Sequence, residues 1–144
     1  MLIGEYIHAL DSKKRLALPA KIRKELGEKI VMTRGLDQCL FIYPRKEWEG
    51  IADKLAKLPM GQADTRNFVR LMLAGAVEMD IDSLGRVLVP DQLKKYAGLE
   101  GRVVIVGVFN RVECWSQDRW LELKQKAEAD ADRLAERLGD LGVY

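Results

Sequence analysis

The sequence predicts an α+β fold built from two tandem copies of one small hairpin module, with helices at its flanks. Three observations support this prediction. The chain repeats itself at an offset of 71 residues, each copy carries a short turn signature between apolar stretches, and the remaining segments have the apolar spacing of amphipathic helices. The 144 residues suffice for one compact domain or for two small ones that share a core.

The repeat is clearest around the turn signatures DSKKR (11–15) and DSLGR (82–86). The residues related by the offset of 71 are Asp11 and Asp82, Arg15 and Arg86, Pro19 and Pro90, and Gly27 and Gly98. After one inserted residue the match continues to Trp48 and Trp120. Two copies of a unit suggest a pseudo-two-fold pair, either side by side or intertwined.

Each copy predicts a β-turn-β-α-β-turn-β unit. A proline opens the short helix as its first residue, because its missing N–H needs no partner there, and a glycine closes it. Apolar residues at i and i+4 of this helix face the core. The expected strands are 5–10, 16–18, 30–33 and 39–43 in the first copy, and 77–81, 87–89, 103–106 and 112–115 in the second.

Longer amphipathic helices are predicted at 46–58, 63–74 and 117–138. The last is highly charged, so a solvated face is its simplest interpretation and a subunit contact is the alternative. The expected organisation is a first module (1–51), a bridging helical segment (52–74), a second module (75–123) and a C-terminal helical tail (124–144).

The signature turns have residues suited to a tight reversal. Asp11 and Asp82 are expected to shape the turns, because an aspartate at a turn entry hydrogen-bonds its own downstream backbone. Gly85 is expected to adopt a positive φ. Arg15 and Arg86 close the turns, and they either pair with these aspartates or present their planar guanidinium groups to DNA.

The charge distribution is uneven although the formal net charge is only +2. Residues 116–144 carry five basic side chains against seven acidic ones. Residues 1–24 carry only two acidic side chains, and their basic ones are Lys13, Lys14, Arg15, Lys21, Arg23 and Lys24. A basic N-terminal part beside an acidic C-terminal part suggests a polyanionic partner on one face.

Several function classes have no support in the sequence. There is no apolar run long enough for a membrane span, and the N-terminus lacks the features of a signal peptide. Cys39 and Cys114 lack metal-ligand spacing and are expected to be buried, reduced thiols, which suits a cytoplasmic protein. His8 has no ligand cluster, and no nucleotide-binding or hydrolase motif occurs. We therefore expect no enzyme activity, no metal and no cofactor.

The paired D-x-x-x-R signatures, each followed by an apolar-x-apolar-Pro segment and a short helix, resemble the MraZ family. The stretch 74–86 and Pro90 are similar to the second domain of that family, and the resemblance covers nearly all of residues 1–138. It implies tandem SpoVT/AbrB-like, swapped-hairpin modules that form one pseudo-symmetric β-barrel. It also implies a nucleoid-associated bacterial transcriptional regulator that binds repeated promoter boxes of the division and cell-wall gene cluster as a ring, typically an octamer.

On this hypothesis double-stranded DNA contacts the basic residues of the turns and of the helices that follow them. Arg15 and Arg86 are the expected central contacts, and Lys13, Lys14, Lys21, Arg23 and Lys24 are expected to add phosphate contacts. The first copy is expected to dominate, since the second adds only Lys94 and Lys95.

Two alternatives remain at this point. One is an oligomeric interaction protein whose basic turns bind an acidic protein. The other is a small β-barrel enzyme, because a fold does not fix a function. The basic first turn favours both binding hypotheses over the enzyme, which would need a cluster of titratable groups that the sequence does not offer.

Overall fold

A computed structural model describes residues 1–143, and it has a mixed α+β fold that follows the repeat. The strands are β1 (Leu2–Ala9), β2 (Arg15–Ala17), β3 (Lys29–Arg34), β4 (Leu40–Pro44), β5 (Val77–Asp80), β6 (Arg86–Leu88), β7 (Arg102–Phe109) and β8 (Val112–Ser116). The helices are α1 (Ala20–Leu26), α2 (Arg45–Ala56), α3 (Ala63–Ala74), α4 (Asp91–Ala97), α5 (Gln117–Ala129) and α6 (Ala131–Asp140). The order β-β-α-β-β-α occurs twice, with α3 between the copies and α6 after the second.

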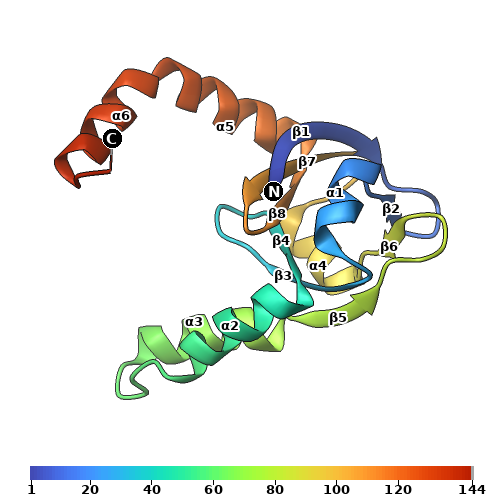
Figure 1. Cartoon of the computed structure of the whole chain (residues 1–144), viewed down its shortest axis with the longest axis horizontal. Coiled ribbons are helices and arrows are strands. Elements are labelled where there is room, and N and C mark those ends of the chain that lie inside the picture. The colour runs from blue at the N-terminus through green and yellow to red at the C-terminus, as the bar shows by residue number, and fades with distance from the viewer. Residues whose placement is uncertain (144) are drawn as a thin grey trace.

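The strands pair antiparallel in two sheets, and these sheets join the two copies. The six-stranded sheet has the order β1-β7-β8-β4-β3-β5, and the two-stranded sheet consists of β2 and β6. Strand β1 of the first copy lies beside β7 of the second, and β5 of the second lies beside β3 of the first. The two copies are therefore intertwined and not side by side (Figure 1).

The predicted pairing of each first strand with its own return strand is wrong. An isolated bridge between Leu10 and Leu16 joins the two arms of the first turn, and beyond it the strands separate. Strand β1 pairs with β7 over eight residues, whereas β2 has three residues and pairs with β6. A three-residue return strand gives its own partner few hydrogen bonds, so the longer pairing with the other copy prevails.

Two helix boundaries also differ from the prediction. Pro19 and Pro90 precede α1 and α4 as N-caps, with ψ values of 142° and 146°, instead of forming their first helical residues. The predicted C-terminal helix is interrupted at Asp130, where α5 ends and α6 begins. Aspartate favours helix ends over helix interiors, and its carboxylate accepts a hydrogen bond from Arg133 at 3.0 Å.

The six-stranded sheet has an apolar core on each face, because successive strand residues point to opposite sides. On one face α2, α3 and α5 provide Trp48, Met72 and Trp120 to a cluster around Val31 and Val104. On the other face the two-stranded sheet and helices α1 and α4 close a second cluster. That cluster contains pairs related by the repeat, namely Leu16 and Val87, Leu18 and Val89, Ile22 and Leu93, and Leu26 and Ala97.

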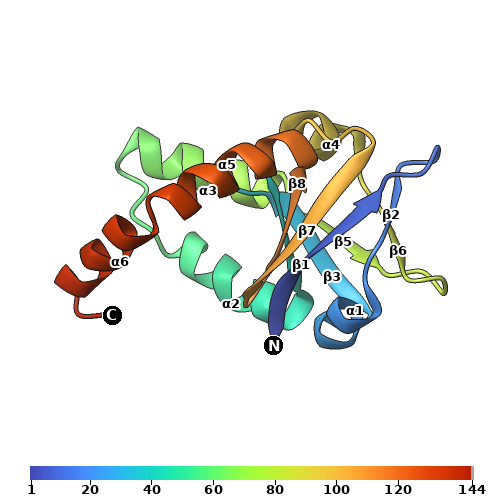
Figure 2. The same ribbon diagram turned by 90° about the horizontal axis from the view of Figure 1, so that it is seen from above.

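The signature turns lie together at one end of the molecule. Figures 1 and 2 show the loops next to β2 and β6 projecting from the sheets on the side opposite to the α2–α3 pair and the α5–α6 arm. Each turn leads into a strand of the two-stranded sheet, and Leu16 and Val87 of these strands lie in the core, so the core fixes the position of both turns.

Candidate nucleic-acid interface

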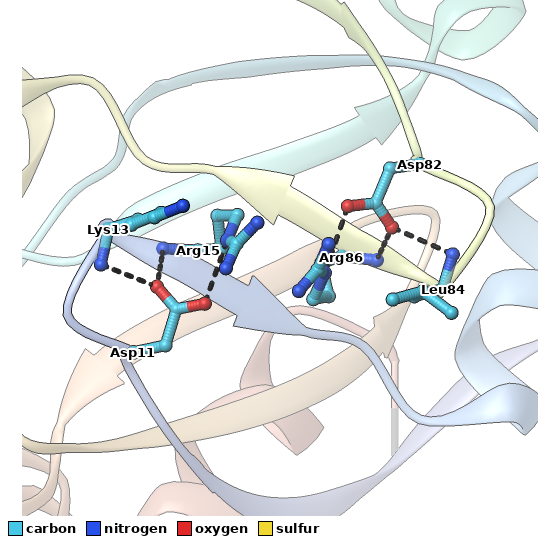
Figure 3. A network of polar contacts seen from close by, with 6 residues as sticks. All are labelled: Asp11, Lys13, Arg15, Asp82, Leu84 and Arg86. Atoms are coloured by element: carbon cyan, nitrogen blue, oxygen red, sulfur yellow. Dashed lines mark hydrogen bonds and ion pairs between the residues drawn. The ribbon is translucent and has the colours of Figure 1, made fainter.

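Asp11 is the hydrogen-bond acceptor around which the first signature turn folds (Figure 3). Its Oδ1 accepts hydrogen bonds from the backbone N–H of Lys13 at 2.8 Å and of Arg15 at 2.9 Å, and its Oδ2 accepts one from Nε of Arg15 at 2.8 Å. These hydrogen bonds, above all the one from the Arg15 backbone, hold the pKa of Asp11 below its usual value. The ionised carboxylate thus fixes both the turn and the direction of the Arg15 side chain.

Asp82 makes the same contacts in the second turn. Its Oδ1 accepts from the backbone N–H of Leu84 at 2.9 Å and of Arg86 at 2.8 Å, and its Oδ2 accepts from Nε of Arg86 at 2.9 Å. The backbone hydrogen bond from Arg86 is the largest cause of the lowered pKa of Asp82. The two copies of the repeat therefore form the same three hydrogen bonds, with the same donor and acceptor atoms, at equivalent positions.

The fourth residue of each turn has a left-handed backbone. Gly85 has a φ of 79°, and Lys14 has a φ of 61° at the equivalent position of the first turn. Their N–H groups donate to the carbonyl oxygens of Asp82 at 2.9 Å and Asp11 at 3.1 Å. A lysine in this region is strained relative to glycine, so the first turn adopts the same shape as the second at a higher conformational cost.

The two-stranded sheet places both signature arginines on its outer face. Its facing pairs are Arg15 with Leu88, Leu16 with Val87, and Ala17 with Arg86. Leu16 and Val87 are buried in the core, and side chains alternate along a strand. Arg15 and Arg86 therefore share the face directed to solvent, and their side chains are 31% and 26% exposed.

The terminal nitrogens of both arginines have no hydrogen-bond partner in the described part of the chain. Nε of each is bound by the aspartate of its own turn, and within residues 1–143 the Nη1 and Nη2 groups of Arg15 and Arg86 donate no hydrogen bond. A guanidinium group held at Nε and open at both Nη atoms can donate two parallel hydrogen bonds to a phosphate or to the O6 and N7 acceptors of guanine. The Asp–Arg pairs thus orient the arginines through Nε and leave Nη1 and Nη2 available to a ligand.

The lysines of the first turn have different surroundings. Lys13 is exposed, whereas Nζ of Lys14 forms an ion pair with the carboxylate of Asp91 at the start of α4. The lysine hydrogen bond lowers the pKa of Asp91. The sequence predicted that the two lysines of the first turn make it more basic than the second turn. Because Asp91 neutralises Lys14, only Lys13 remains as an additional unpaired charge within residues 1–143.

Helix α1 has the remaining basic residues predicted to lie at the interface. Lys21 and Lys24 are exposed, but Arg23 is half-buried and lies against Gly85 of the second turn. Arg23 thus lies at the second signature turn, where its side chain packs against Gly85.

Two exposed leucines of the second turn and its strand were missed as interface residues by the sequence analysis. Leu84 is 69% exposed at the turn, and Leu88 is 58% exposed beside Arg15. The signal for Leu88 was present, because alternation from the buried Val87 and Val89 places it on the outer face with Arg86. Leu88 thus adds an apolar side chain to the face of the sheet that carries both signature arginines.

The structure offers little for catalysis or metal binding in its described part. Cys39 and Cys114 are free and buried, and burial raises the pKa of both thiols, that of Cys114 to about 12. They therefore remain protonated and poorly nucleophilic. Within residues 1–143, no cluster of three or more His, Cys, Asp or Glu side chains is placed to hold a metal ion, and no helix has the length and apolarity that a membrane span needs. His8 lies on β1 opposite Val103.

Comparisons with known proteins agree with the repeat. The model of a family described as "MraZ protein, putative antitoxin-like" matches twice, over residues 1–71 and over residues 72–141. A protein of Clostridium beijerinckii named Transcriptional regulator MraZ is 49% identical over 143 residues, which are 99% of this chain and 100% of the relative. Proteins of the same name from Caldicellulosiruptor bescii and Syntrophomonas wolfei are each 47% identical, with the same coverage. The chain therefore belongs to the MraZ family.

Proposed function

We propose that this protein is a sequence-specific regulator of transcription that binds double-stranded DNA through the outer face of its β2–β6 sheet. The observation that carries the proposal is the pair of arginines, each held at Nε by an aspartate and each, among residues 1–143, without a hydrogen-bond partner at Nη1 and Nη2. The relatives named Transcriptional regulator MraZ, similar over their whole length, support this role.

The arginines and the surrounding lysines have different tasks in this proposal. Arg15 and Arg86 contact base edges or phosphates with their forks, and Lys13, Lys21 and Lys24 add phosphate contacts that increase affinity without selecting a sequence. Lys14 contributes only when phosphate displaces Asp91 from it. Asp11 and Asp82 remain within the turns, because an anion at a DNA surface is repelled.

One chain offers few phosphate contacts, so assembly is part of the proposal. Non-specific binding by such modules has dissociation constants of about 10⁻⁴–10⁻⁶ M at physiological salt. Several subunits on repeated boxes gain about 10²–10⁴ in avidity, because each further contact is intramolecular. We propose a ring-shaped homo-oligomer, an octamer in the family's typical form, in which each subunit presents its β2–β6 sheet to one promoter box. On this proposal the protein acts in the cytoplasm at the nucleoid, on the division and cell-wall gene cluster.

A second candidate is binding of an acidic protein by the same surface. Leu84 and Leu88 favour it, because exposed leucines among basic side chains suit a protein partner as well as a nucleic acid. Sequence preference separates the two candidates, since a surface built for an acidic protein does not distinguish one DNA sequence from another.

The test is fluorescence anisotropy with DNA from upstream of the protein's own gene and with scrambled DNA, at two salt concentrations. Wild type should prefer the upstream DNA, and Arg15→Ala and Arg86→Ala should each lose about 1–3 kcal/mol of binding free energy. Lys57→Ala is the control, since Lys57 is the C-cap of α2, and the α2–α3 pair lies on the side of the molecule opposite the turns (Figure 1). Equal, weak binding of both DNAs by wild type would contradict the DNA proposal and favour the acidic protein partner.

A further inference from the structure

Arg23 of the first copy lies directly on Gly85 of the second signature turn. A Cβ atom at residue 85 would lie 2.1 Å from Nη1 and 2.5 Å from Cζ of Arg23, so the guanidinium occupies the space that any other side chain would need. The backbone of the same copy also reaches this glycine, because the Leu18 N–H donates to the Gly85 carbonyl at 2.9 Å. The first copy therefore holds the tip of the second turn at two points.

The surroundings of Arg23 indicate a packing role within the protein. Its Nε is buried and has no hydrogen-bond partner in residues 1–143, unlike Nε of Arg15 and of Arg86. A buried nitrogen without a hydrogen-bond partner costs free energy, so the packing of this part of the Arg23 side chain against the turn has to offset that cost. The Nε atom of Arg23 is therefore removed from water where the side chain contacts the second turn.

The first turn is held by the second copy in a related way. The Val89 N–H donates to the Lys14 carbonyl at 2.9 Å, which is the repeat equivalent of the bond from Leu18 to Gly85. The side-chain contact differs, because Lys14 reaches out to Asp91 on α4 whereas Gly85 receives Arg23 from α1. Each signature turn is thus braced by the helical segment of the other copy.

We infer that Arg23 is a positioning residue for Arg86, the signature arginine of the other copy. Gly85 immediately precedes Arg86, and both belong to the turn that Asp82 closes. A shift of Gly85 therefore moves the base of the Arg86 side chain. The assignment to DNA binding rests on the proposed function, whereas the support of the turn is a property of the free protein.

The first experiment measures hydrogen exchange of the free full-length protein by mass spectrometry. Arg23→Ala should accelerate exchange in peptides spanning residues 82–88 by about fivefold or more, because the turn opens more often. Peptides spanning 11–17 should keep their wild-type rates. The matched control is Lys24→Ala, which removes an exposed cation from the same helix and should leave both regions unchanged. Unchanged exchange at 82–88 in Arg23→Ala, or equal acceleration of both turns, would overturn the inference.

The second experiment is a double-mutant cycle for binding to the upstream DNA. Arg23→Ala should weaken binding in the wild-type and Arg15→Ala backgrounds, but much less in Arg86→Ala, with a non-additivity of about threefold or more. Arg23→Lys keeps the charge without the planar fork, so it should weaken binding nearly as much as alanine. Full binding by Arg23→Lys, or additivity with Arg86→Ala, would instead make Arg23 an independent phosphate contact. If wild type shows no preference for the upstream DNA, the proposed function fails, while the exchange experiment still decides whether Arg23 supports the turn.

Discussion

Lys14 and Asp91 form an ion pair between the first signature turn and the helix that follows the second. The side chains are 46% and 76% exposed, so water and salt screen the pair and its contribution to stability is small. Its consequence for a polyanionic partner is larger, because the acid competes with phosphate for the lysine. On the proposed function, Asp91 therefore limits sequence-independent binding by holding Lys14.

Asp91→Asn should raise the affinity for scrambled DNA as well as for upstream DNA. With Lys14 released, the slope of log K against log salt concentration should become more negative by up to about 0.9, the value for one additional phosphate contact. The measurement is a salt titration of anisotropy, with Lys14→Ala/Asp91→Asn as the control. Equal slopes for wild type and Asp91→Asn would show that Lys14 stays away from DNA.

The signature turns should loosen in acid. The pKa values of Asp11 and Asp82 are both lowered in the folded protein, so their contribution is complete above the unfolded value of about 4 and is lost as the pH falls through the lower folded value. We expect Tm to fall as the pH drops below about 4. Asp11→Asn/Asp82→Asn should have a lower Tm at neutral pH and a flatter acidic limb. A variant curve parallel to that of wild type would mean that other carboxylates control the acid transition.

Gly85→Ala should destabilise the protein by about 1–2 kcal/mol from the positive φ alone, and further through the clash with Arg23. The double variant Arg23→Ala/Gly85→Ala lacks the clashing side chain, so it should be free of the cost of the clash but should keep the cost of the positive φ. Urea unfolding of the single and double variants measures both. Strict additivity would argue against the contact between the two residues.

Alanine substitutions on the two faces of the β2–β6 sheet should affect different properties, stability on the inner face and partner binding on the outer face. Leu16→Ala removes a fully buried side chain and should cost about 2–5 kcal/mol of unfolding free energy. Leu88→Ala on the outer face should change stability by less than about 0.5 kcal/mol. Its effect should appear in partner binding, so anisotropy and urea unfolding together separate the two roles. A large loss of stability in Leu88→Ala would make this residue part of a folded interface between subunits.

Much of the local structure followed from the residues themselves. The offset of 71 identified two equivalent turns, and aspartate at the first turn position predicted the hydrogen bonds that Asp11 and Asp82 accept. Gly85 indicated its own positive φ, because glycine alone adopts it freely. The apolar spacing predicted the positions of the long helices to within a few residues. The exception is Asp130, where the predicted C-terminal helix is divided into α5 and α6.

The strand partners and the contacts around the turns were decided only by the tertiary structure. The hydrogen-bonding capacity of β1 is the same whether its neighbour is β2 or β7, so the sequence of β1 does not specify the partner. Ion pairs and packing depend on distance, and Lys14 and Asp91 are 77 positions apart in the chain. The sequence by itself determined that the chain has two equivalent turns and that each turn ends in an arginine paired with its own aspartate. The intertwined fold decided that each turn is supported by the other copy, because the shared core brings α1 to Gly85 and α4 to Lys14.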